Sequence, residues 1–325
     1  MRAVIPVAGI GTRLKPHTYS TPKVLLNVGG KPILAHLLDK LLEEGLNKAT
    51  FIIGYLGEMI KEFVEREYPS IKSDFIVQEE MHGLGHAIYL AVPTFDENDI
   101  FVILGDTLFD VDLSYVFRSK YSSLGVKEVE DPRRFGVAIV KDDFIQKLVE
   151  KPQEPVSNLA LVGLYYFKKA ESLKSALTEL VKKDIRTKGE LQLTDAIQIM
   201  IEKGEKITTF PVEGWYDCGK PETLLSTNQY LLSKRDNGRE METVVINKPV
   251  FIADDAVIKN SVIGPYTTIA SGTRIEDSII KNSLIGSGAR VSRAMLENSI
   301  IGDNSVIQGS FKRLNSGNST EIDFY

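Results

Sequence analysis

An unbroken apolar segment that ends in closely spaced glycines opens the chain. Residues 3–8 read AVIPVA, and the next five residues read GIGTR. A continuous apolar segment of this length is typical of a strand that is buried on both faces of a sheet. Glycines directly after such a strand allow a sharp turn that brings backbone N–H groups close to a ligand. This segment therefore predicts a buried strand followed by a loop that cradles a polyphosphate.

Two basic side chains in the same segment strengthen this prediction. Arg13 carries a planar guanidinium that can bind two phosphate oxygens at once, and Lys23 follows a proline that stiffens the backbone beside it. Two other glycine loops do not fit. The dinucleotide fingerprint needs a glycine where Leu14 stands, and the P-loop string is absent from the sequence. An ordinary glycine-rich turn is the alternative for Gly9 and Gly11 taken alone.

Strands and helices alternate along the first hundred residues. We expect helices at 31–44, at 58–66 and from about residue 86, and strands at 49–54, 75–77 and 100–104. This alternation predicts a mainly parallel sheet covered by helices, in which ligands bind beyond the carboxyl ends of the strands. The glycine loop, Gln78 and Asp106 all fall at such ends.

Two of these strand-end residues suggest a nucleotide and a metal ion. A glutamine such as Gln78 can both donate to and accept from a nucleobase edge, and Gly83 would let that base lie against the backbone. A carboxylate such as Asp106, just past a buried strand, can hold Mg²⁺, which prefers oxygen ligands. Each has a simpler alternative: Gln78 as an ordinary polar strand end, and Asp106, like Asp110 and Asp112, as a turn or helix cap.

Further strands and a repeat follow. Residues 135–140, 144–149 and 160–167 predict an inserted hairpin layer that forms one wall of the pocket, before a helix at 190–203 and a strand at 206–212. Beyond a polar linker at 233–242, the strings NSVIG, NSLIG and NSIIG begin at residues 260, 282 and 298, and aliphatic residues recur six positions apart. A six-residue aliphatic period predicts a hexapeptide β-helix of about three coils.

Composition limits the classes of function. The 325 residues carry a formal net charge of −5 without a Lys/Arg-rich segment, which disfavours a nucleic-acid partner. A single cysteine, Cys218, precludes an internal disulfide. Because we find neither a signal peptide nor an apolar stretch long enough to cross a membrane, we expect a cytoplasmic protein without a membrane partner. The four histidines lack the spacing of a zinc site.

Several motifs, taken in order, resemble those of the sugar-1-phosphate nucleotidylyltransferases. They are G-x-G-T-R-L-x-P-x-T with a following P-K, then L-G-D at 104–106, E-K-P at 150–152 and W-x-D-x-G at 215–219. The forms V-A-G-I-G-T-R and G-L-G-H-A are similar to the uridylyltransferase branch. The resemblance implies transfer of a nucleoside monophosphate from dTTP or UTP to a sugar 1-phosphate, as in the glucose-1-phosphate thymidylyl- and uridylyltransferases.

The resemblance also implies roles for individual residues. Arg13 would hold the leaving pyrophosphate, and Lys23 would neutralise the α-phosphate region. The nucleotide would contact Ala8, Gly9, Gly11, Thr12, Gln78 and Gly83. The sugar phosphate would contact Gly136, Glu150, Lys151, Gly163 and Trp215, with a weaker case for Glu190. Asp106 and Asp217 would bind one Mg²⁺ together.

The predicted fold class is α/β: a Rossmann-like, mainly parallel nucleotidyltransferase domain at 1–235, a short left-handed parallel β-helix at 243–312, and a tail at 313–325. The β-helix predicts a homo-oligomer. Three other functions stay open: a catalytically silent nucleotide-sugar-binding regulatory subunit, a mannose-1-phosphate guanylyltransferase, and an acyltransferase that uses the β-helix. The last fits least, because β-helix acyltransferases use a histidine base and no histidine follows His86.

Overall fold

The computed structural model describes residues 1–235, 237–238 and 240–310, which divide into two units. The first comprises Met1–Leu26 and Lys31–Leu224. The second comprises Asn27–Gly30 and the described residues from Leu225 onward. The domain limits predicted from the sequence stay predictions, and the predicted tail at 313–325 lies outside the described residues.

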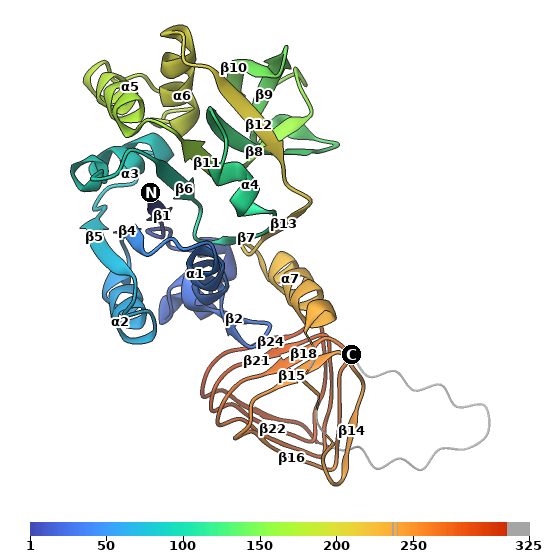
Figure 1. Ribbon diagram of the computed structural model, residues 1–325. Helices are drawn as coiled ribbons and strands as arrows, with labels where there is room; N and C mark the ends of the chain where they lie inside the picture. The colour runs from blue at the N-terminus through green and yellow to red at the C-terminus, as the bar shows by residue number, and fades with distance from the viewer. Residues whose placement is uncertain (236, 239, 311–325) are drawn as a thin grey trace. The chain divides into compact units, whose positions relative to one another are not determined.

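A nine-stranded mixed sheet forms the centre of the first unit (Figure 1). Its order is β10-β9-β11-β6-β1-β4-β5, with β8 beside β11 and β12 beside β8. The neighbours β6, β1, β4 and β5 are all parallel, as the alternation of strands and helices predicts. The strands are β1 (Arg2–Pro6), β4 (Lys48–Ile53), β5 (Lys72–Val77), β6 (Ile100–Ile103), β8 (Ser122–Glu128), β9 (Gly136–Lys141), β10 (Phe144–Glu150), β11 (Leu159–Phe167) and β12 (Ile207–Pro211).

The strands predicted as a separate hairpin layer belong to this sheet instead. β9 and β10 pair with each other, and β11 joins them to the parallel half because its later residues, Leu164–Phe167, pair antiparallel with β6. The predicted hairpin of β9 and β10 is present, but it extends the sheet because the two halves of the nine-residue β11 pair with β9 and with β6.

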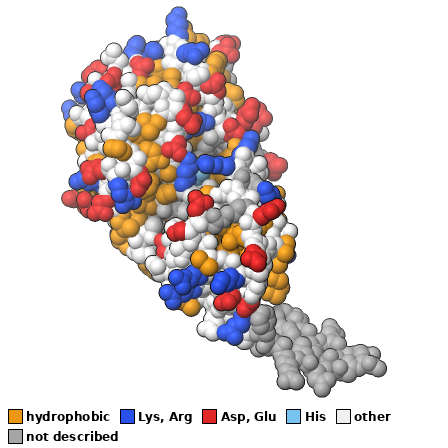
Figure 2. Space-filling model, turned by 60° about the horizontal axis from the view of Figure 1, so that its bottom comes forward, with side chains coloured by type: hydrophobic (Ala, Val, Ile, Leu, Met, Phe, Trp, Pro, Cys, Tyr) orange, Lys and Arg blue, Asp and Glu red, His pale blue; other side chains and the backbone are white. Residues whose placement is uncertain are grey.

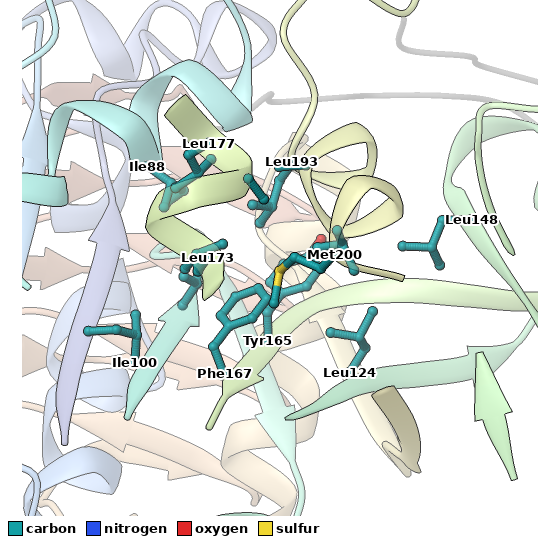
Figure 3. Packing of buried hydrophobic residues seen from close by; sticks show 14 of the residues in the cluster. Ile88, Ile100, Leu124, Leu148, Tyr165, Phe167, Leu173, Leu177, Leu193 and Met200 are labelled. Atoms are coloured by element: carbon teal, nitrogen blue, oxygen red, sulfur yellow. The ribbon is translucent and has the colours of Figure 1, made fainter. Parts of the chain in front are cut away.

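Helices cover both faces of the sheet, because strand residues alternate between two apolar clusters. Ala3 and Ile5 of β1 pack with α1 (Ile33–Glu43) and α2 (Gly57–Glu67). Val4 belongs to the cluster on the opposite face, which includes Ile88 and Leu177 (Figure 3). The helices of that cluster are α3 (Leu84–Leu90), α5 (Ala170–Lys182) and α6 (Leu193–Glu202).

Several short elements, two longer helices and the sheet strand β8 have no counterpart among the elements predicted from the sequence. The helices are α4 (Leu113–Phe117), α5, α7 (Pro221–Lys234), and the 3₁₀ turns Thr12–Leu14, His17–Tyr19, Lys23–Leu25, Val92–Thr94 and Pro132–Arg134. The short strands are β2 (Asn27–Val28), β3 (Lys31–Pro32), β7 (Thr107–Asp110) and β13 (Gly214–Asp217). Among the described residues, no helix has the length and apolar character that crossing a membrane requires.

The second unit is a left-handed parallel β-helix with three faces. Each face is a parallel sheet of four strands, so the described residues form four coils rather than the three predicted. The first coil lacks the NSxIG string, which is why the repeat alone undercounts. Its strands are β14 (Val244–Ile246), β15 (Val250–Ile252), β16 (Val257–Lys259), β17 (Ser261–Ile263), β18 (Thr267–Ile269), β19 (Arg274–Glu276), β20 (Ile279–Lys281), β21 (Leu284–Ile285), β22 (Arg290–Ser292), β23 (Met295–Glu297), β24 (Ile300–Ile301) and β25 (Val306–Gln308).

The repeat explains these coils physically. Ile263, Ile269 and Ile275, which lie six residues apart, are all buried inside the β-helix. Asn282 and Asn298 have φ values of 41° and 52°, the left-handed region that asparagine tolerates better than most residues. The Asn282 amide also donates to Asn298 Oδ1 on the next coil at 2.6 Å. The predicted fold class, with its α/β domain and β-helix, is therefore confirmed.

Charged side chains of both signs lie on the visible surface. Lys and Arg side chains are interspersed with Asp and Glu side chains on the face drawn in Figure 2. This distribution accords with the small formal net charge of −5.

Candidate active site

The glycine loop leaves β1 at the carboxyl end of the parallel strands. Val7 still donates its N–H to Ile52 O, at 2.8 Å, so the chain turns only after this residue. Gly11, with φ 69°, begins the 3₁₀ turn Thr12–Leu14, and Leu14 donates back to Gly11 O at 2.9 Å. Leu14 is fully buried and anchors the turn in the core.

The two glycines of the loop are glycine for different reasons. A Cβ on Gly11 would lie 3.0 Å from Thr18 Cγ2 and 3.1 Å from Lys23 Cβ, so the fold itself needs glycine there. A Cβ on Gly9 would meet nothing within 4 Å. Gly9 lines a cavity instead, which means that its small size keeps space open rather than allowing internal packing.

That cavity has a volume of about 310 Å³. It lies beyond the carboxyl ends of β1, β5 and β6, where ligands bind in parallel sheets. Six residues of the predicted site line it: Ala8, Gly9, Lys23, Gln78, Gly83 and Asp106. Apolar side chains such as Met81, Leu84 and Leu104 complete much of the wall. The structure thus brings together residues from four segments that are well separated in the sequence.

Lys23 and Asp106 form an ion pair in this cavity. Lys23 Nζ lies 2.6 Å from Asp106 Oδ2, and the Lys23 side chain is only 8% exposed. Thr107 Oγ1 also donates to Asp106 Oδ1 at 3.2 Å. Burial alone would raise the pKa of Asp106, but the charge and hydrogen bond of Lys23 hold this pKa below its usual value. The carboxylate therefore stays ionised.

Asp106 and Asp217 are neighbours through the β7–β13 pair. Asp217 pairs with Thr107 in the antiparallel register, and the Cys218 N–H donates to Asp106 O at 3.2 Å. The described residues contain no group of three or more His, Cys, Asp or Glu side chains that could hold a metal ion. Two carboxylates still fit Mg²⁺, which commonly takes one or two from the protein and the rest from water and phosphate.

Arg13 and Asp217 meet at Gly219. A Cβ on Gly219 would lie 2.7 Å from Arg13 Nη2 and 2.8 Å from Asp217 Oδ1, so both polar groups reach into the space that this glycine leaves free. Gly219 lies outside the positive-φ region, which means that its backbone does not require glycine. Sequence patterns assign Gly219 no role beyond its place in W-x-D-x-G, because the Arg13 side chain beside it comes from a distant segment.

Apart from Glu190, the residues predicted for the sugar phosphate lie outside the lining of this cavity. Glu150 Oε2 accepts from Thr194 Oγ1 at 3.1 Å, and Gly136 leaves room for that carboxylate, since a Cβ there would lie 2.9 Å from it. Lys151 Nζ lies 3.6 Å from Glu150 Oε1. Lys151 also has φ 45°, an uncommon conformation for a residue other than glycine. Such strain often marks a functional position.

Packing within the protein already accounts for two of the predicted glycines. A Cβ on Gly163 would lie 2.6 Å from Leu104 Cδ1, and one on Gly83 would lie 2.6 Å from Leu191 O. Both glycines also have positive φ values, 88° and 107°. Their contacts with sugar and base stay predictions. Trp215 packs against an apolar cluster, with its ring 4.9 Å from that of Phe135, so packing within the protein also accounts for this tryptophan.

Other side chains near the site have clear local roles. Glu190 lines the cavity beside Gly83, although it lies before α6 rather than inside the helix predicted at 190–203. Asp112 accepts hydrogen bonds from the N–H groups of Ser114 and Tyr115, which makes it the predicted helix cap.

Comparison with known proteins identifies the family. A model of the nucleotidyl transferase family matches residues 2–234, which span nearly all of the first unit. The chain belongs to this family. One relative below is named a glucose-1-phosphate thymidylyltransferase, and the resemblance of the motifs is therefore confirmed.

Relatives of this nucleotidyl transferase match over most of their length. The chain is 34% identical over 316 residues to the low-salt glycan biosynthesis nucleotidyltransferase Agl11 of Haloferax volcanii, covering 88% of this chain and 87% of the relative. It is 32% identical over 293 residues to a glucose-1-phosphate thymidylyltransferase of Streptomyces antibioticus, covering 86% and 81%. A solved UDP-glucose pyrophosphorylase in complex with UDP-glucose is similar with a TM-score of 0.61 at 25% identity, covering 72% of this chain and 99% of that one.

Proposed function

We propose that this nucleotidyl transferase transfers a nucleoside monophosphate from dTTP or UTP to a sugar 1-phosphate, with glucose 1-phosphate as its preferred acceptor. The products are a nucleotide-sugar and pyrophosphate. One observation carries the proposal: the glycine loop, Lys23, Gln78 and Asp106 surround one cavity at the carboxyl edge of a parallel sheet. This set offers backbone N–H groups and a cation for phosphates, an amide for a base, and a carboxylate for a metal ion.

The chemistry requires two anions to approach each other. A phosphate oxygen of the sugar 1-phosphate attacks the α-phosphorus of the nucleotide, and the bond from that phosphorus to the pyrophosphate oxygen breaks. Because no covalent intermediate with the protein is needed, positioning and charge stabilisation are the main tasks of the protein. Arg13 and the loop amides at 8–12 would bind the leaving pyrophosphate, and Lys23 the α-phosphate.

Asp106 and Asp217 would hold Mg²⁺, whose charge, when it is bound, offsets the negative charge on the phosphates. Their backbones are already adjacent in the β7–β13 pair, which supports a shared role. Asp106 is ionised, as a metal ligand must be, because Lys23 lowers the pKa of its carboxyl group against the effect of burial.

The nucleobase and the sugar would lie at different parts of the site. Gln78, which is buried at the end of β5, offers both a donor and an acceptor to a pyrimidine edge. Lys151, held in its uncommon conformation beside Glu150, would bind the sugar phosphate. The names of two relatives support these substrates, since one is a glucose-1-phosphate thymidylyltransferase and the other was solved with UDP-glucose.

A substrate grid tests the proposal. Pyrophosphate release with Mg²⁺ is measured for dTTP, UTP, GTP, CTP and ATP against glucose, galactose, mannose and N-acetylglucosamine 1-phosphates. We expect the highest rate with dTTP or UTP and glucose 1-phosphate. The highest rate with GTP and mannose 1-phosphate would instead identify a guanylyltransferase. No release with any pair, together with a raised melting temperature in nucleotide-sugars, would identify a binding subunit without catalytic activity.

A further inference from the structure

The cavity contains a cation that is already neutralised by the protein. Lys23 begins the 3₁₀ turn Lys23–Leu25, and its ammonium lies 2.6 Å from the carboxylate of Asp106. The two residues are 83 positions apart, and both line the cavity. The Lys23 side chain is 8% exposed, whereas that of Asp106 is 39% exposed. The carboxylate is therefore the partner that solvent and ions can reach first.

While this ion pair persists, the electrostatic attraction between the Lys23 ammonium and an incoming polyphosphate is reduced. Asp106 cancels the charge of Lys23 and adds a negative charge beside the place where a phosphate would bind. Releasing Lys23 without replacing its partner is unfavourable, because a buried charge that loses its partner is left uncompensated. A metal-free nucleotide must therefore compete with Asp106 for Lys23.

A divalent cation removes this competition. If Asp106 transfers its interaction to the cation, Lys23 becomes available to a phosphate, and each charged group exchanges one partner for another. We propose that the Lys23–Asp106 ion pair makes the cavity selective for the cation-complexed form of its polyphosphate substrate. This inference rests on the proposed function, and it adds a second role to Asp106, which suppresses binding of the metal-free form.

Thermodynamic linkage makes the inference quantitative. If the cation raises nucleotide affinity by freeing Lys23, the nucleotide must raise cation affinity by the same factor. Couplings of this kind are typically about 5- to 150-fold. The factor should depend on both residues of the pair, since it arises from the exchange of partners and not from either charge alone.

Calorimetry with pyrophosphate tests the inference. Affinity is measured in EDTA and in Mg²⁺ for the wild-type chain, Asp106→Asn, Lys23→Met and the double variant. In EDTA we expect Asp106→Asn to bind pyrophosphate about tenfold more tightly than the wild type, because Lys23 is then free. In the Lys23→Met background, the same substitution should change the affinity much less.

A matched control separates partner exchange from simple repulsion. Asp217→Asn also removes a predicted metal-binding carboxylate, but Asp217 lies near Arg13 rather than in the pair with Lys23. Its effect on affinity in EDTA should be equal in the Lys23 and Lys23→Met backgrounds. Circular dichroism and melting temperature check the fold of each variant, and Lys23→Gln replaces Lys23→Met if the latter unfolds.

The outcomes separate this inference from the proposed function. If the wild-type chain binds neither pyrophosphate nor any nucleoside triphosphate in Mg²⁺, the proposed function fails. If binding in Mg²⁺ is normal but Asp106→Asn has the same effect in both backgrounds, repulsion alone explains it and the ion-pair inference is overturned. Tighter metal-free binding that depends on Lys23 supports the inference.

Discussion

Left-handed backbone conformations occur in both units, but the groups that surround and stabilise these residues differ. In the β-helix, asparagines take them at equivalent positions of successive coils, and the Asn282 amide donates to Asn298 on the next coil. In the first unit, the positive φ values at Gly11, Gly83 and Lys151 each lie in a different environment. A repeated conformation is stabilised by its neighbouring copy, whereas an isolated one depends on segments that are distant in the sequence.

The interiors of the two units also differ, because one is packed throughout and the other leaves a cavity. The β-helix stacks aliphatic side chains of similar size, such as Ile263 and Ile280, and its buried polar groups are mostly serines and threonines bonded to the backbone. The edge of the sheet in the first unit leaves a cavity that holds a buried lysine. Packing fills the interior of the β-helix, whereas the edge of the sheet keeps an open cavity lined by charged groups.

The largest expected effect is on turnover, and it is confined to the first unit. Arg13→Ala should lower kcat about 10²- to 10³-fold, since the variant loses one preorganised donor to the leaving pyrophosphate. Its melting temperature should hardly change, because Arg13 is exposed. Steady-state kinetics with the best substrate pair measures this effect. Near-normal turnover would remove Arg13 from the site.

A substitution in the β-helix should lower stability and leave turnover nearly unchanged. Ile269→Ala removes a fully buried side chain and should destabilise the second unit by about 2–5 kcal/mol, with less than a twofold change in kcat. Hydrogen exchange at the amides of β18, compared with those of β1, measures where the stability is lost. An equal loss of protection in β1 would show that the two units do not unfold independently.

Gly219→Ala tests whether a glycine in the first unit serves the site and not the fold. The new methyl group would displace Arg13 and Asp217, so kcat should fall roughly 10- to 100-fold while the melting temperature stays within about 1 °C. The Mg²⁺ concentration for half-maximal rate should also rise. Gly204→Ala is the control: it strains a turn with φ 88° after α6 and should lower stability without changing the Mg²⁺ dependence.

Gly9→Ala and Gly11→Ala should separate the two glycines of the loop. Gly9→Ala puts a methyl group into the cavity and should weaken nucleotide binding about tenfold without loss of stability. Gly11→Ala should weaken nucleotide binding and also lower stability, because the φ of 69° at this position and the closeness of Thr18 disfavour a side chain. Calorimetry measures nucleotide affinity, and thermal melting measures stability, for both variants. Equal loss of stability in both variants would contradict the distinction.

The smallest effect should come from the asparagine ladder. Asn298→Ala should destabilise the β-helix by about 1–2 kcal/mol, because alanine is disfavoured at its φ of 52°. Asn298→Gly keeps the backbone conformation and loses only the hydrogen bond from Asn282, so it should cost less. Denaturant titration compares the two, and an equal cost would assign the stability to the hydrogen bond.

Local patterns in the sequence were enough to predict much of this molecule. The buried strand before the glycine loop, the alternation that gives β4, β5 and β6, and the six-residue period of the β-helix all follow from short-range preferences. The order of motifs also identified the family. These features can be predicted because burial and turn preferences depend on residues that are close in the chain.

Which side chains face one another depends on the order of the strands in the sheet. The tertiary structure pairs Lys23 with Asp106, brings Arg13 and Asp217 to Gly219, and lets β11 join the predicted hairpin to the central sheet. No local pattern encodes such contacts, since each depends on how strands from distant parts of the chain are ordered in the sheet. Local patterns specify which kinds of groups the site contains, whereas the packing of the sheet specifies which of them are held together before a ligand arrives.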